Sequence, residues 1–162
     1  MITTMARVKM FAEPEMRVES GAPTTSDSGA LGDIWLDNDA DSATFGKTWE
    51  LIDIVTVPEP SYAWKAYDKL DARIERFLSR VERDFLAIRG IPFESNDEGV
   101  VYPDYASDIA AEMVCYAAGL GAYEGRGMDA ESVSDRSRTY ERKINGYPRS
   151  IVGSIERFQG IA

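Results

Sequence analysis

One segment of this sequence, residues 62–89, repeats its apolar residues with the period of an α-helix and sorts its charged residues by sign. At about 100° per residue, one arc of such a helix is apolar. This arc holds Tyr67, Leu70, Ile74, Phe77, Leu78, Val81, Phe85 and Ile88. A basic arc holds Lys65, Lys69, Arg73, Arg76, Arg80 and Arg83, and an acidic arc holds Asp68, Asp71, Glu75 and Glu82. We therefore predict one long amphipathic helix over 62–89, with Ser61 as its N-cap and Gly90 after its end.

The separation of the two signs suggests that each charged edge of this helix contacts something outside the helix. A helix that is only solvent-exposed usually mixes acidic and basic residues. Three interpretations stay open: solvated faces, a head-to-tail contact between the acidic edge of one copy and the basic edge of the next, and a basic arc that faces DNA. The candidate subunit-interface residues are Arg73, Arg76, Arg80, Asp71, Glu75 and Glu82.

Length and composition limit the class of protein. With 162 residues the chain can form one domain with its own core, so we predict a single domain over 1–162. It has no histidine and one cysteine, Cys115, which excludes Ser-His-Asp and Cys-His catalysis and any intramolecular disulfide. Residues 1–11 lack the apolar core of a secretory signal, and no apolar run approaches the roughly 18 residues that span a bilayer. We expect an intracellular or virion-borne protein with no membrane partner.

Negative charge is concentrated in residues 12–60, where eleven acidic and two basic residues give −9 of the net −10. The stretches 33–37 and 47–57 are rich in β-prone residues and flank a polar loop, so we predict a β-hairpin. The preceding run 14–32 is rich in Gly, Pro, Ser and Thr, which predicts a linker or mobile loop.

Three more helices are predicted, so the expected fold class is mainly α, with a long central helix and a β-hairpin. A short helix over 5–11 follows Thr3 or Thr4 as its cap. A helix over 104–119 has large side chains on one side and small ones on the other, so it is covered nearly all round. Its own core covers one side, and the other side is covered either by more of the same chain or by a neighbouring subunit. A last helix from Pro148 carries an apolar stripe that docks on its own domain or on a partner. We expect residues 128–145 to form an extended loop or an edge strand.

Possible catalytic and metal sites are weak. Asp37, Asp39 and Asp41 alternate as in an EF-hand calcium loop, but Ser42 replaces the required glycine and Thr48 the required glutamate. The glycine-rich stretch 119–127 fits neither a dinucleotide loop nor a phosphate loop. A carboxylate-metal enzyme stays open as a third class, but no acidic pair is placed by the sequence. We expect no enzymatic activity, catalytic residue, cofactor or metal ion.

Five stretches of the chain resemble the head-tail connector proteins of long-tailed bacteriophages, also called adaptor or head-completion proteins. They are MITTMARVKMF, ARIERFLSRVERDFLAIRGIPF, YPDYASDIAAEMVCYAAG, ESVSDRSRTYER and GYPRSIVGSIERF. These motifs are patterns of packing residues, and they cover 1–11 and about 68–158 in the expected order.

The resemblance implies a small helical connector domain that forms a ring, commonly a dodecamer, beneath the portal protein at the capsid vertex. Such a ring extends the DNA channel, through which double-stranded DNA passes without sequence-specific binding. It also offers a docking surface to the next neck protein or the tail terminator. The implied location is the virion neck, with assembly in the host cytoplasm. Candidates for portal docking are the last-helix residues Ile151, Ile155 and Phe158.

The chain departs from the connector pattern at residues 14–60, which we interpret as an acidic insertion that bears the β-hairpin. This insertion is expected to project from the ring, either toward a neck protein or into the channel, where its charge would repel DNA. The alternative function is an acidic protein-binding module of another kind, such as a DNA-mimicking inhibitor.

Overall fold

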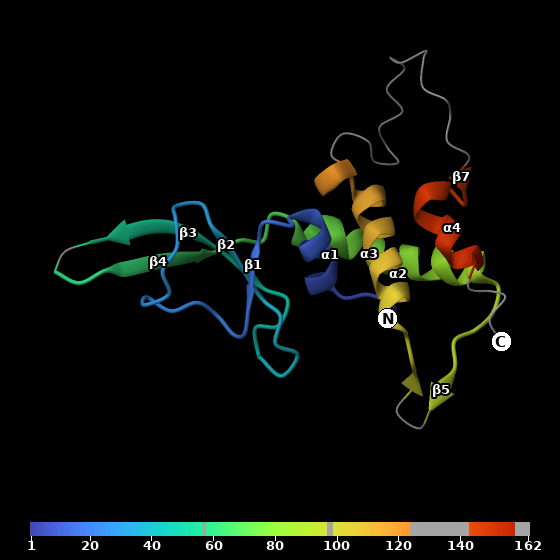
Figure 1. Ribbon diagram of the computed structural model, residues 1–162, viewed down its shortest axis with the longest axis horizontal. Helices are drawn as coiled ribbons and strands as arrows, with labels where there is room; N and C mark the ends of the chain where they lie inside the picture. The colour runs from blue at the N-terminus through green and yellow to red at the C-terminus, as the bar shows by residue number, and fades with distance from the viewer. Residues whose placement is uncertain (57, 97–98, 124–142, 158–162) are drawn as a thin grey trace, which may run out of the picture.

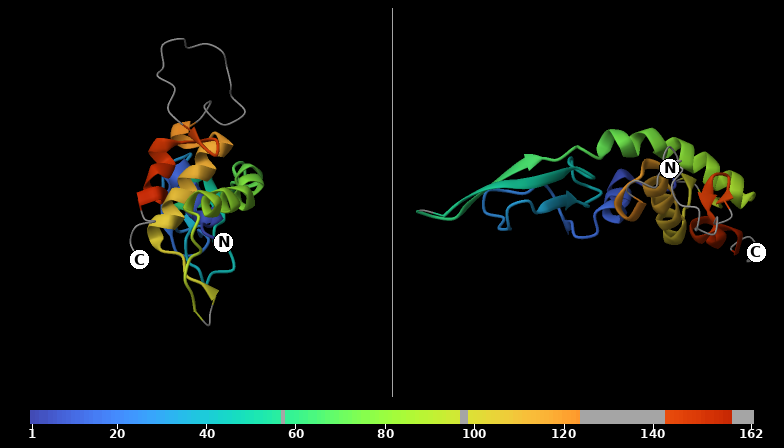
Figure 2. Two further views of the ribbon diagram at one scale, coloured as in Figure 1. Left: turned by 90° about the vertical axis from the view of Figure 1, so that its right-hand side faces the viewer. Right: turned by 90° about the horizontal axis from the view of Figure 1, so that it is seen from above.

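Helices and sheet lie at opposite ends of an elongated molecule (Figure 1). The computed structural model describes residues 1–56, 58–96, 99–123 and 143–157. Four α-helices in these residues form a helical body, and β1 to β4 form a sheet that projects from it (Figures 1 and 2). The first helix, α1 (Met5–Ala12), lies where the two parts meet.

The helical body is built around α3 (Asp104–Ala118), which packs against α1, α2 (Asp71–Arg89) and α4 (Arg149–Arg157). Small residues allow this close approach of three neighbours. The buried small residues of α3 are Ala106, Ala110, Ala111, Ala117 and Ala118. Of the two ways to cover this helix, the structure shows the first, a core within the same chain.

Helix α1 belongs to both parts of the molecule. Thr4 caps it, because the Arg7 N–H donates to Thr4 Oγ1 at 3.2 Å. Its Val8 and Ala12 enter the core of the helical body. Its Ala6 packs instead with Met16 and Leu36 in a small second cluster under the sheet. The sheet is therefore attached to the body through the opposite face of α1.

The sheet has the order β1-β2-β3-β4, formed by β1 (Arg17–Glu19), β2 (Ile34–Asp37), β3 (Thr48–Val55) and β4 (Ser61–Ala66). The pair β1–β2 is parallel, and the other two pairs are antiparallel. A register shift between Leu51 and Asp53 places a bulge at Ile52. Strand β2 pairs with β3 only as far as Glu50, so the outer part of the β3–β4 hairpin extends beyond the rest of the sheet (Figure 1).

The remaining elements are short. Strands β5 (Ser95–Asn96) and β6 (Gly99–Val100) form one small hairpin. Strands β7 (Lys143–Ile144) and β8 (Tyr147–Pro148) form another directly before α4. A 3-10 turn, η1 (Gly121–Tyr123), follows α3.

The prediction of a mainly α fold is wrong. The chain is 39% helical and 22% strand, with a mixed four-stranded sheet, so its class is mixed α/β. The error arose largely at residues 61–66, which form β4 instead of the first turns of the long helix. Tyr62 and Trp64 pair across to Ile54 and Leu51, and this cross-strand packing outweighs the helical pattern that these residues also satisfy.

The other predicted element boundaries agree with the structure only in part. Helix α2 begins at Asp71 with Leu70 at its N-cap, so the predicted cap at Ser61 is wrong, whereas the predicted end before Gly90 is confirmed. The predicted hairpin of 33–37 with 47–57 is confirmed as β2 and β3. The predicted linker 14–32 is wrong in part, because it contains β1 and turns that are hydrogen-bonded to the sheet. Most of the predicted extended segment 128–145 lies outside the described residues.

Candidate interaction surfaces

The acidic residues predicted for the subunit interface mostly bind groups within their own chain. Asp71 Oδ1 lies 2.6 Å from Lys9 Nζ of α1. Glu82 Oε1 accepts a hydrogen bond from the Ile2 N–H at 3.1 Å and lies 3.4 Å from the Met1 amine. Glu75 is exposed and has no ion pair among the described residues. Each charged edge of α2 does contact groups outside the helix, but for Asp71 and Glu82 these groups are intramolecular.

The basic residues predicted for the subunit interface differ in their contacts. Arg73 Nη2 donates to the carbonyl oxygens of Ala118 and Gly119, and so caps the C-terminus of α3. Arg80 lies 3.7 Å from Asp84, one turn further along α2, and remains about half exposed.

Two further arginines of α2 are exposed. The guanidinium of Arg76 lies 5.6 Å from the centre of the Phe77 ring, and Arg76 itself is exposed. Arg83 is exposed, without an ion pair in the part of the chain that the structure describes. Helix α2 lies along one edge of the helical body (Figure 2), and its residues Arg76, Arg80 and Arg83 are exposed.

The portal-docking candidates lie mainly in the core. Ile151 and Ile155 are each 2% exposed and belong to the hydrophobic core of the helical body, while Phe158 lies outside the described residues. Tyr147, just before α4, donates its hydroxyl to Asp84 Oδ2 at 2.9 Å. Burial and this hydrogen bond raise the pKa of Tyr147. The last helix therefore docks on its own domain, and Ile151 and Ile155 are unavailable to a partner in this conformation.

A buried lysine joins the sheet to the helical body. Lys9 is 1% exposed, and its Nζ donates to the Gly46 carbonyl oxygen at 2.9 Å and to Thr48 Oγ1 at 3.2 Å. The same ammonium forms the ion pair with Asp71. A buried ammonium is stable only when its donors find partners, and here they come from α2, from β3 and from the loop before β3. Sequence analysis missed Lys9, because a single lysine in a short amphipathic helix gives no local sign of burial.

The points where the chain leaves and re-enters the helical body are also tied together. The Tyr67 hydroxyl donates to Glu13 Oε1 at 3.0 Å. Burial, together with this hydrogen bond, raises the pKa of Tyr67 to about 12. Thr48 Oγ1 donates to the Tyr67 carbonyl oxygen, and the Tyr67 N–H donates to Thr48 O at 2.8 Å. The whole sheet lies between Glu13 and Tyr67 in the sequence, so it is closed off at a narrow base.

The three aspartates weighed as a calcium loop stabilise the turn after β2 instead. Asp37 is buried and accepts hydrogen bonds from the N–H groups of Gly21 and Asp39, both at 2.9 Å, and from Thr44 Oγ1 at 2.7 Å. Burial alone would raise the pKa of the Asp37 carboxyl, but hydrogen bonds from Ser42, Asp39, Thr44 and Gly21 outweigh it and lower the pKa to about 2. Asp39 accepts from the Asp41 N–H at 3.0 Å. Among the described residues, no group of three or more Cys, Asp or Glu side chains is placed to hold a metal ion.

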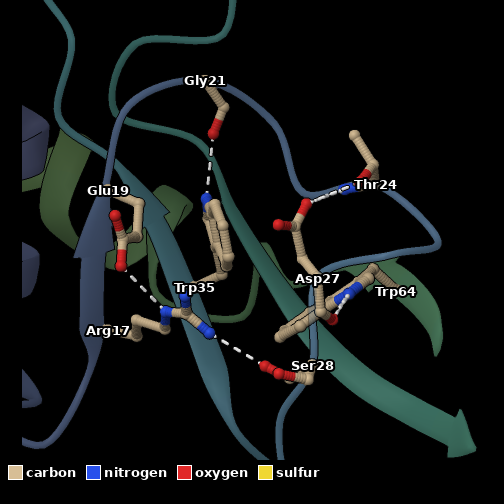
Figure 3. A network of polar contacts seen from close by, with 8 residues as sticks. All are labelled: Arg17, Glu19, Gly21, Thr24, Asp27, Ser28, Trp35 and Trp64. Carbon is tan, nitrogen blue, oxygen red and sulfur yellow. Dashed lines mark hydrogen bonds and ion pairs between the residues drawn. The ribbon is translucent and has the colours of Figure 1, made fainter.

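One face of the sheet is covered by residues 20–33, which tie to it through tryptophan side chains (Figure 3). Trp35 Nε1 donates to Gly21 O at 2.9 Å, and Trp64 Nε1 donates to Asp27 O at 3.2 Å. The two rings meet edge to face, with centres 5.6 Å apart. A hydrogen bond from Thr24 lowers the pKa of Asp27. Both indole N–H groups find their hydrogen-bond acceptors within the chain, so this aromatic cluster stabilises the covering loop.

The outer end of the β3–β4 hairpin is both acidic and apolar. Ile52 is 52% exposed and Val55 is 49% exposed. Asp53 of the same strand and Glu59 before β4 are also exposed. Sequence analysis predicted the strand but not this exposure, because the bulge at Ile52 breaks the alternation of inward and outward side chains.

Cys115 has the environment of a structural cysteine. It is 2% exposed, and its Sγ lies 3.6 Å from the Val8 carbonyl oxygen. Burial, with a smaller effect of Glu112, raises the pKa of the thiol to about 12. A thiol with so high a pKa is a poor nucleophile at neutral pH.

Comparison with known proteins gave no relative: the chain matches no family model, no curated protein and no solved structure. None of the helices in the described residues combines the length and the apolar character needed to cross a bilayer.

Proposed function

We propose that this chain is a non-enzymatic subunit of a bacteriophage head-tail connector. In this proposal, identical subunits form a ring, a dodecamer by analogy with the connectors that the sequence resembles. The ring binds the portal protein on one side and the next neck protein or tail terminator on the other. Double-stranded DNA passes through its centre without sequence-specific binding. The subunit assembles in the host cytoplasm and ends in the virion neck.

The observation that carries the proposal is the match between the connector-like segments and the helical body. Connector-like sequence covers residues 1–11 and about 68–158, and the described helices in these ranges share one hydrophobic core. The dissimilar residues 14–60 hold β1, β2 and β3 of the projecting sheet and the loops between them. The resemblance thus stops close to where the chain leaves the body and resumes where it returns, as expected for a helical domain that carries an insertion.

The sheet has a role in this proposal. It carries most of the net negative charge and extends away from the helical body (Figure 1). An acidic projection toward the channel repels DNA and prevents it from sticking, whereas a projection outward offers a docking surface. Neither role requires a catalytic group.

Two experiments test the proposal. Cryo-electron microscopy of the virions produced by the encoding genome is expected to show a ring of this chain between portal and tail. Removal of its coding sequence is expected to leave DNA-filled or DNA-leaking heads without tails, with tails restored by the chain supplied in trans. Virions with no density for this chain at the neck, or normal tailed particles without it, would reject the proposal.

The acidic protein-binding module remains the second candidate because of the charge on the sheet. The two candidate functions predict different behaviour of the purified protein. A DNA-mimicking inhibitor remains monomeric and competes with DNA for a DNA-binding protein, whereas a connector forms an annular particle or joins the portal. Negative-stain imaging with and without portal separates the two.

A further inference from the structure

The outer face of α2 carries positive charge that its own chain leaves largely unneutralised. Arg76, Arg80 and Arg83 follow at intervals of four and three residues, so they lie on one side of the helix over roughly 10 Å. Of the four acidic residues of the same helix, Asp71 binds Lys9, Glu82 binds the N-terminal residues and Asp84 lies 3.7 Å from Arg80, while Glu75 is exposed. Arg76 and Arg83 have no ion pair among the described residues. Leu86, one turn further on, is an apolar side chain that is 37% exposed.

The tip of the β3–β4 hairpin carries acidic and apolar side chains, which complement the arginines of α2. Asp53 and Glu59 are exposed there and have no ion pair among the described residues. The neighbouring Ile52 and Val55 leave about half of their surface in water. An exposed β-hairpin end that combines carboxylates with β-branched apolar side chains is suited to a surface of arginines with an adjacent apolar side chain.

These two surfaces cannot meet within one molecule. The hairpin tip points away from the helical body, and α2 lies within that body (Figures 1 and 2). The base of the sheet is held by the buried Lys9 contacts and by the Tyr67–Glu13 hydrogen bond, which oppose folding the sheet back onto the body. A contact between tip and helix must therefore involve a second copy.

We infer that the hairpin tip of one copy docks on the outer face of α2 of the next. In this contact Asp53 and Glu59 face Arg76, Arg80 and Arg83, and Ile52 and Val55 pack beside Leu86. Because the two surfaces differ, the contact is heterologous and repeats head to tail, closing into a ring or continuing as a filament. The inference deepens the proposed connector function, since it assigns the ring contact to the insertion and not to the two edges of α2.

The strength of this contact depends on salt. Exposed ion pairs contribute little each, typically below about 1 kcal/mol, so the apolar side chains supply part of the affinity and the charges set the orientation. Added salt screens the exposed charges, and assembly is expected to weaken as ionic strength rises. A contact made only by apolar side chains would strengthen or stay constant instead.

Charge reversal tests the contact on the full chain. The helix variant Arg76→Glu/Arg83→Glu and the hairpin variant Asp53→Lys/Glu59→Lys are each expected to be monomeric in sedimentation velocity under conditions where the wild type assembles. An equimolar mixture of the two variants is expected to assemble, because each variant then meets a complementary partner at both surfaces. One chain that carries all four substitutions is expected to assemble by itself. Arg149→Glu, an exposed change on α4, is the control and should assemble like the wild type.

The outcomes are distinguishable. Unchanged assembly of both reversed variants, a monomeric mixture or a wild type that stays monomeric at its highest soluble concentration would overturn the inference, provided that circular dichroism shows folded variants. Loss of double-stranded DNA binding by the helix variant with assembly intact would also overturn it and assign the arginines to nucleic acid. Assembly that follows the charge rules in a chain absent from the virion neck would reject the connector function and leave the contact standing.

Discussion

Lys9 Nζ lies 2.6 Å from Asp71 Oδ1, and this ion pair joins the first helix to the start of α2 across 62 residues of sequence. The same ammonium donates to the carbonyl oxygen of Gly46 and to Thr48, which belong to the sheet. One buried side chain thus fixes three segments against one another. The orientation of the sheet relative to the body depends on it.

We predict that Lys9→Met destabilises the protein by about 1–3 kcal/mol, because Gly46 O and Thr48 lose a donor while methionine fills most of the space. Asp71 Oδ1 is buried, but the Asp71 side chain as a whole is 38% exposed, so the loss stays below that of a fully buried pair. Urea unfolding measures the change. The exposed Lys47→Met is the matched control, with an expected effect within about 0.5 kcal/mol. Equal unfolding midpoints for the two variants would contradict the assigned role.

The close approach of Glu13 and Tyr67 predicts that the helical body folds without the sheet. Replacing residues 14–66 by a short Gly-Ser linker keeps both residues and needs to span little distance, since their side chains are hydrogen-bonded. The shortened chain is expected to retain helical circular dichroism and a cooperative thermal transition. A chain that ends at Pro148 is the comparison: it lacks α4 and its buried side chains, and is expected to lose the transition. A shortened body without cooperative unfolding would show that the sheet is part of one folding unit.

Sequence patterns predicted the elements whose burial is local and periodic. Residues 71–89 keep the apolar period of a helix, and their predicted core residues Ile74, Phe77 and Phe85 are buried. The same period fitted residues 62–70 by coincidence, and only pairing with β3 shows that Tyr62 and Trp64 form a strand. Long-range contacts gave no signal in the sequence.

In the candidate surfaces, too, local patterns could be predicted and long-range contacts could not. The basic arc at Arg76, Arg80 and Arg83 was visible, because helical spacing alone places these residues together. The intramolecular contacts of Asp71 and Glu82 could not be predicted, because their partners Lys9 and Ile2 lie more than 60 residues away in the sequence. Exposure of Ile52 depends on a bulge, and no local pattern marks that bulge.

Asp37 predicts a specific loss of stability in acid. Its pKa is about 2 in the folded protein, whereas an unfolded aspartate titrates near 3.9. The carboxylate therefore stabilises the fold fully above pH of about 4, and this contribution is lost as pH falls toward about 2. Asp37→Asn is expected to lower stability at neutral pH by about 1–3 kcal/mol and to flatten its pH dependence over this window. Urea unfolding at several pH values measures both effects, with the exposed Asp41→Asn as the control that keeps the wild-type profile.

Cys115 predicts slow thiol chemistry. Its side chain is buried and its pKa is raised to about 12, so little thiolate forms at neutral pH. Reaction with an aromatic disulfide reagent is expected to be slow in the native protein and rapid in urea. Fast labelling of the folded chain would show that α1 and α3 separate readily, because Cys115 lies against Val8.

Truncating a buried side chain of α4 tests whether the apolar stripe of this helix packs in the core or binds a partner. Ile151→Ala removes a side chain that is 2% exposed, and the cavity is expected to cost about 2–5 kcal/mol of unfolding free energy. Ile91→Ala is the matched control, because Ile91 is 49% exposed and its truncation is expected to cost less than about 0.5 kcal/mol. Chemical unfolding of the isolated protein measures the core role without any partner. A wild-type midpoint for Ile151→Ala, together with lost binding to the portal, would mean that α4 leaves the body to dock and that its position against α3 is not its working one.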